Sequence, residues 1–105
     1  DKIDAVTALS GSGPAYFFYF IEAMVKAGVE LGLTDEIATK LAIETISGSA
    51  AMLKESNLDA ATLRKNVTSP KGTTAAALEV FSNSDLENII LKAMSAAKNR
   101  AQELA

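Results

Sequence analysis

The sequence predicts an all-α fold, a helical bundle. Apolar residues recur with the helical period along almost the whole 105-residue chain, and no segment alternates convincingly like a β-strand. Apolar residues make up 49% of the chain, while its 6 glycines and 2 prolines are few, so we expect an ordered domain with one modest core. The residues between the periodic segments then define the helices in order.

The first two helices follow from the positions of glycine and proline. Residues 2–10 predict a short helix, or the tail of a longer one, that ends at Gly11. Pro14 then lies in the first turn of a long helix, where a missing N–H costs nothing. Gly32 stops that helix after about Leu31.

A second long helix begins after Thr34, whose side chain can cap the first N–H groups, and it continues to about Glu55. A short helix from about Asp59 to Asn66 follows. The expected apolar stripe of the long helix consists of Ile37, Leu41, Ile46, Ala50 and Leu53.

Two further helices complete the chain. A turn at Ser69–Gly72 leads into a helix over Thr73–Phe81, and Ser84 or Asp85 caps the last helix. The residues expected to face inward from the last helix are Leu86, Ile89, Ile90, Ala93, Ala97 and Leu104.

The composition excludes several classes of protein. Without cysteine or histidine the chain has no thiolate nucleophile and lacks the commonest general base and zinc ligand, and no metal-ligand spacing is present. A formal net charge of -3 argues against a nucleic-acid partner. No signal-peptide pattern occurs, so we expect a cytoplasmic protein. A charged stripe of Glu22, Lys26 and Glu30 on the most apolar helix argues against a membrane span.

Two features bear on assembly. Aromatic side chains surround the start of the first long helix, and they need cover on more sides than a monomer of this size supplies. Small residues at Ser47–Met52 let another backbone approach closely, either within the chain or from a second subunit. The aromatic cluster favours the second explanation, and it consists of Tyr16, Phe17, Phe18, Tyr19 and Phe20.

The segment TSPKGTT, Thr68–Thr74, is the strongest candidate site. Pro70 fixes one φ angle, and we expect Gly72 to supply a conformation that other residues resist. The turn presents the N–H groups of residues 72–74 at a helix start, where they lack carbonyl partners and the helix dipole favours an anion such as a carboxylate. Lys71 adds positive charge nearby.

Ordinary N-capping by Ser69 or Thr73 explains the same residues, and spacing alone favours it. Nothing in the segment resembles a nucleophile with its base. The segment Ser10–Tyr16 contains a G-x-G, but no strand precedes it, so it predicts a corner between two helices. The functional alternative is that this turn and Thr7 form part of the wall of a pocket. The chain's carboxylates fall on faces expected to be exposed to solvent.

Two segments together resemble a known family. DAVTALSGSGPAYFF (Asp4–Phe18) and LRKNVTSPKGTTAAALEVF (Leu63–Phe81) are similar to the C-terminal domain of pyrroline-5-carboxylate reductase, and the resemblance covers essentially Asp4 to Leu104. It implies a helical domain that interleaves with a second subunit in a homodimer, with decamers in many members. It also implies NADPH- or NADH-dependent reduction of 1-pyrroline-5-carboxylate to L-proline, in proline synthesis.

The resemblance further implies that an N-terminal Rossmann domain binds the nucleotide. This chain shows no such domain, so we expect residues 1–105 to be one dimerisation and substrate-binding domain of a longer reductase, inactive alone. No residue of the chain is expected to bind the cofactor or a metal. A non-catalytic dimerisation module, or the dimerisation domain of a related NAD(P)-linked reductase, is the alternative.

The same resemblance implies the site residues. Ser69 and the backbone N–H groups of Gly72 and Thr73 hold the substrate carboxylate, and Thr7 faces the same pocket. Thr74 matches the threonine whose hydroxyl meets the ring nitrogen, so it is the candidate catalytic residue. Lys71 departs from the family pattern, which usually has a small residue at this position. A positive φ there would strain the lysine backbone, and the Lys71 side chain could point outward or steer the substrate.

Overall fold

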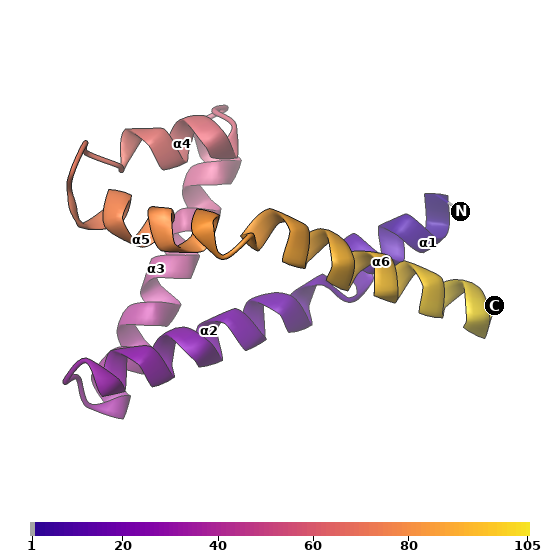
Figure 1. Cartoon of the computed structure of the whole chain (residues 1–105), viewed down its shortest axis with the longest axis horizontal. Coiled ribbons are helices and arrows are strands. Elements are labelled where there is room, and N and C mark those ends of the chain that lie inside the picture. Colours follow the sequence, from indigo (N-terminus) through magenta and orange to yellow (C-terminus); the bar gives the residue numbers. More distant parts are fainter. Residues whose placement is uncertain (1) are drawn as a thin grey trace. The chain divides into compact units, whose positions relative to one another are not determined.

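The computed structural model describes residues 2–105, so the first residue of the predicted domain lies outside the described residues. No strand occurs among residues 2–105, and the all-α prediction is confirmed. The elements, drawn in Figure 1, are α1 (Lys2–Val6), the π-helix η1 (Thr7–Gly11), α2 (Gly13–Glu30), α3 (Asp35–Glu55), α4 (Ala60–Asn66), α5 (Thr73–Asn83) and α6 (Leu86–Leu104).

Most helix boundaries lie where the capping signals predicted them. Gly32 takes a φ of +112° in the turn after α2, a conformation that residues with a Cβ rarely adopt. The Ile37 N–H donates to the Thr34 hydroxyl at 3.2 Å and caps α3. Before α4, the Thr62 N–H donates to an Asp59 oxygen at 2.8 Å, and hydrogen bonds from the Thr62 side chain and backbone lower the pKa of Asp59.

Two junctions differ from the prediction. The helix expected over residues 2–10 is an α-helix only to Val6, and it widens into η1 before Gly13. Asp85 precedes α6 as expected, but it is left-handed at φ 65° and ψ 43°, and its side chain caps no backbone N–H. Its carboxylate accepts instead from the Asn88 side-chain amide at 3.1 Å.

The chain divides into two compact units. In the first, made of residues 2–15 and 67–105, α1 and η1 pack against α6 and against each other, and α5 also packs against α6. The second, residues 16–66, contains most of α2 with α3 and α4. Near the turn between α2 and α3, a Cβ at Gly28 would lie 3.2 Å from that of Ala38, so the glycine lets these helices approach closely.

Neither unit encloses the core that the sequence predicted. The buried apolar residues among those described are Ala8, Ala38 and Ala42. The stripe residues Leu41 and Leu53 of α3 are 52% and 50% exposed, and Ile89 of α6 is 54% exposed. For these residues the expectation of a place in the chain's own core is wrong, because about half of each side chain is exposed in the part of the chain that the structure describes.

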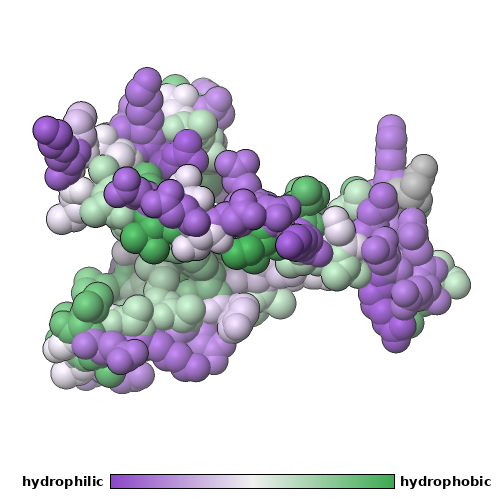
Figure 2. Space-filling view, in the orientation of Figure 1, coloured by the Kyte–Doolittle hydropathy of each residue, from purple (hydrophilic) through white to green (hydrophobic). Residues whose placement is uncertain are grey.

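The uncovered surface is large. The accessible area is 8525 Å² for a chain of 11.0 kDa, about 2,900 Å² more than the ~5,600 Å² expected of a compact monomer of that mass. Phe17, Phe18 and Tyr19 of α2 are 59%, 72% and 74% exposed. Figure 2 shows apolar residues at the surface among the charged ones. Monomers rarely expose so much apolar area, so these faces have the character of an interface.

Candidate functional site

The predicted turn between α4 and α5 is present. The Gly72 N–H donates to the Ser69 carbonyl at 3.0 Å and closes a four-residue turn with Pro70 and Lys71 in the middle. Lys71 has a φ of 62°. Proline at the second position and a positive φ at the third fit a type II turn, in which the third position favours glycine.

Gly72 serves a different purpose from the one the sequence predicted. Its φ of -87° and ψ of -174° are extended values that any residue adopts, so the expectation of an unusual backbone at Gly72 is wrong; that conformation falls on Lys71. Gly72 is needed for space, because a Cβ there would lie 3.2 Å from the Ser69 carbonyl oxygen and 3.5 Å from the Ser69 Cβ. The left-handed conformation costs Lys71 about 1–2 kcal/mol.

The start of α5 has no side-chain cap. Gly72 is the N-cap residue and no side chain bonds the first turn, so the capping by Ser69 or Thr73 that spacing favoured does not occur. The first backbone bond into the helix runs from the Ala76 N–H to the Gly72 carbonyl at 3.1 Å. The N–H groups of Thr73, Thr74 and residue 75 precede that bond and have no partner among the described residues. They are therefore available to an anion, which the helix dipole also favours.

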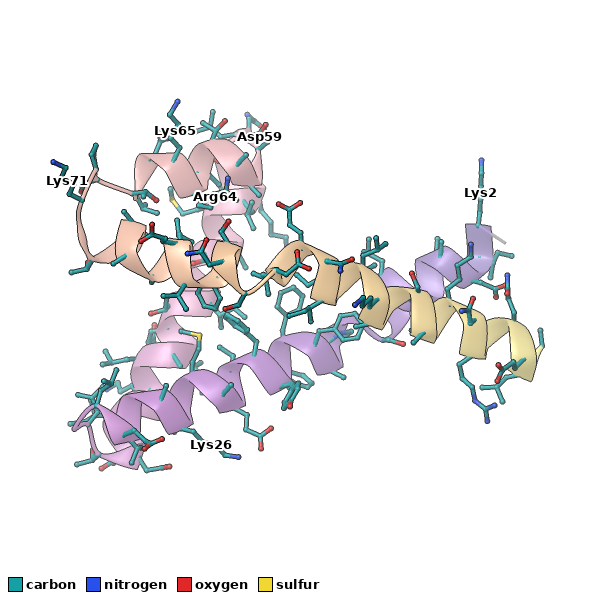
Figure 3. The ribbon with its side chains drawn as sticks, in the orientation of Figure 1. Lys2, Lys26, Asp59, Arg64, Lys65 and Lys71 are labelled. Atoms are coloured by element: carbon teal, nitrogen blue, oxygen red, sulfur yellow. The ribbon has the colours of Figure 1, made fainter. Side chains whose placement is uncertain are left out.

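The side chains around this helix start are polar and accessible. Ser69 and Thr73 are exposed and Thr74 is half-buried. The Ser69 hydroxyl lies 3.6 Å from the position a Cβ would take at Gly72, beside the first turn of α5. Lys71 is exposed and, in Figure 3, its side chain projects away from α5, which agrees with the outward alternative of the sequence analysis.

Thr7 lies elsewhere in the same unit. It is an exposed residue of η1, and η1 packs against α1 and α6, whereas the loop leads into α5. Figure 3 draws Lys2 of α1 and Lys71 of the loop at opposite ends of this unit. Ser69, Gly72, Thr73 and Thr74 therefore lie together at the start of α5, whereas Thr7 lies on η1.

The described residues offer little for other kinds of site. No group of three or more acidic or cysteine side chains could hold a metal ion within residues 2–105. The G-x-G of Ser10–Tyr16 follows η1 rather than a strand, which does not fit a dinucleotide-binding turn. None of the described helices is both long and apolar enough to cross a bilayer. The helical period did not predict one local feature, the π-turn η1, for which Ser10 was the available signal because its hydroxyl can bond the Val6 carbonyl.

A helical domain with apolar faces this exposed has the features of the class of oligomerisation domains, and the start of α5 is open to a small anion. The family model for pyrroline-5-carboxylate reductase dimerisation matches residues 1–104, and the chain belongs to this family. A dimerisation domain forms oligomers, which accounts for the uncovered faces.

Curated relatives and solved structures agree with this family. The chain is 49% identical over 104 residues to the pyrroline-5-carboxylate reductase of Pseudomonas aeruginosa, covering 99% of this chain and 38% of the relative. It is 47% identical over 120 residues to that of Mycobacterium leprae, covering 98% and 41%. The chain thus spans well under half the length of these relatives.

Two solved structures are similar over nearly the whole chain. The pyrroline-5-carboxylate reductase of Coxiella burnetii superposes with a TM-score of 0.96 at 46% identity, over 100% of this chain and 39% of that one. The Plasmodium falciparum pyrroline carboxylate reductase, solved with NADP bound, gives 0.92 at 37% identity, over 96% and 38%.

Proposed function

We propose that this chain is the dimerisation and substrate-holding part of a pyrroline-5-carboxylate reductase, which reduces 1-pyrroline-5-carboxylate to L-proline with NADPH or NADH in proline synthesis. The family match and the reductases that are 49% and 47% identical to it over the aligned residues support this activity. The relatives are longer, and the G-x-G of this chain does not follow a strand as a dinucleotide-binding turn would. We therefore assign nucleotide binding to a Rossmann domain joined to this one, as the NADP-bound Plasmodium falciparum relative suggests.

The observation that carries the proposal is the uncapped start of α5 beside the Ser69–Gly72 turn. A cyclic imine with a carboxylate needs a small site for one anion, and the free N–H groups of Thr73 and Thr74 provide one without a buried charge. The Ser69 hydroxyl, beside the same turn, can donate a further hydrogen bond to the carboxylate.

Thr74 is the residue we assign to the reacting end of the substrate. Thr74 is a half-buried residue in the first turn of α5, and its hydroxyl can hydrogen-bond the ring nitrogen while the backbone holds the carboxylate. The nicotinamide supplies the hydride that adds to the imine carbon. The ring nitrogen takes its proton from solvent water, and the Thr74 hydroxyl orients that nitrogen, so the chain contributes position and not a strong acid or base.

We further propose that a second copy of the chain completes the pocket with its Thr7. Within one unit, Thr7 lies on η1, which packs against α1 and α6, whereas the Ser69–Thr74 loop leads into α5. The apolar faces of α2 and α6 are exposed and are available to an interleaved dimer. We place this dimer, alone or within a decamer, in the cytoplasm.

The test is NADPH- and NADH-dependent reduction of 1-pyrroline-5-carboxylate, comparing a full-length polypeptide that includes the nucleotide-binding domain with residues 1–105 alone. We expect activity in the longer polypeptide and none in the shorter one. If the longer polypeptide is inactive with both nucleotides, the reductase assignment is wrong.

A further inference from the structure

The π-turn η1 is a feature that the proposed reaction leaves unexplained. Over Thr7–Gly11 the helix is wider than an α-helix, and the Ser12 N–H donates to the Thr7 carbonyl, five residues earlier, at 2.8 Å. Turns of this kind are rare and occur frequently at functional sites. Thr7, the first residue of this turn, is also the residue that we place against the substrate.

Ser10 stabilises the wide turn by a hydrogen bond from its side chain to the backbone. Its hydroxyl donates to the Val6 carbonyl, four residues earlier, at 3.0 Å. In a regular α-helix that carbonyl accepts the backbone N–H of residue 10, and serine hydroxyls that bond at this spacing bend helices. Gly11 is not what makes the turn wide, because a Cβ there would meet Thr7 Cγ2 only at an ordinary 3.6 Å.

The packing of η1 fixes which side of the turn is buried and which is exposed. Ala8 is 2% exposed, and η1 packs against α1 and α6, so this side of the turn is fixed. The neighbouring Thr7 is exposed. Because each residue of a helix advances by about 100°, one extra residue in the turn changes the direction of Thr7 relative to the start of α2 by that amount. The width of η1 therefore decides where the Thr7 hydroxyl points.

We propose that Ser10 is a positioning residue, which holds the π-turn open and so directs the Thr7 hydroxyl toward the substrate. This inference rests on the proposed function, in which Thr7 contacts 1-pyrroline-5-carboxylate. Ser10 itself touches neither substrate nor nucleotide; it acts through Thr7.

Steady-state kinetics of Ser10→Ala in the full-length reductase test the inference. We expect the KM for 1-pyrroline-5-carboxylate to rise about 3- to 10-fold, the size of one lost neutral hydrogen bond, with kcat and the KM for the nucleotide unchanged. Ser10→Thr keeps the hydroxyl and is expected to restore the KM. Thr45→Val is the matched control, because the Thr45 hydroxyl donates to the Leu41 carbonyl at the same spacing, 2.7 Å away, within the regular helix α3.

The double variant Ser10→Ala with Thr7→Val separates positioning from a general loss of stability. If Ser10 acts through Thr7, Ser10→Ala adds nothing to the effect of Thr7→Val. Additive losses in the double variant, or an unchanged KM in Ser10→Ala, would overturn the inference while the reductase assignment stands. A wild-type full-length protein without activity would overturn the proposed function, and this inference with it.

Discussion

The left-handed conformation of Lys71 predicts that glycine at this position stabilises the protein. With a φ of 62°, Lys71 carries a steric cost of about 1–2 kcal/mol that glycine does not have. Glycine offsets part of this gain, because its unfolded chain has more conformations, worth about 0.4–1 kcal/mol. Lys71→Gly is therefore expected to raise the free energy of unfolding by about 0.5–1 kcal/mol.

Urea denaturation at one fixed protein concentration measures this change, because the stability of an oligomer depends on concentration. Lys71→Ala is the matched control, since it removes the same exposed charge but keeps the Cβ and its steric cost. If Lys71→Gly is no more stable than Lys71→Ala, the reasoning from the backbone angle is wrong. Comparing kcat/KM for the two variants also tests steering, because a charge effect would lower both equally and more strongly at low salt.

Three further predictions concern the reaction, the assembly and the pH dependence of stability. Thr74→Val is expected to lower kcat/KM by a factor that corresponds to about 1–3 kcal/mol, and an unchanged kcat/KM would remove Thr74 from the reacting end. Phe18→Ser is expected to weaken the dimer by about 1.5–3 kcal/mol per chain, which light scattering would detect as a lower mass on dilution. Glu22→Gln on the same helix is the control, and an unchanged mass of Phe18→Ser would contradict an interface at Phe18. Because the pKa of Asp59 is lowered in the folded state, its contribution to stability is present above its ordinary pKa of 3.8 and is lost as the pH falls through the lower folded value. Asp59→Asn should therefore reduce the loss of stability at acid pH, and identical profiles of stability against pH would contradict this role of Asp59.

The helices could be predicted from the sequence because their ends are local events. Thr34 caps α3 and Gly32 follows α2 for reasons contained in a few neighbouring residues. The turn at Ser69–Gly72 was predicted for the same reason. The backbone angles within this turn were not predicted correctly, because a proline followed by lysine and glycine does not reveal which of the last two residues takes the positive φ.

The core was predicted wrongly, and the reason is physical. An apolar stripe such as that of Ile89 on α6 shows that something covers this face, but it does not show that the covering helix belongs to the same chain. The aromatic residues of α2 were the better guide, because they exceeded what one chain could cover. The candidate site has the same property: the turn before α5 is local and was found, whereas the position of Thr7 relative to it depends on elements distant in sequence.

Assembly and the proposed chemistry thus depend on the same surfaces. With only Ala8, Ala38 and Ala42 buried among its apolar residues, the described chain has little to hold its helices in place outside an oligomer. The uncapped start of α5 is rigid only as far as α5 is held, and α5 packs on α6, whose outer face is uncovered. A substitution on the exposed face of α6 should therefore weaken substrate binding at low protein concentration and recover as the concentration rises, whereas a substitution in the Ser69–Thr74 loop should weaken it at every concentration.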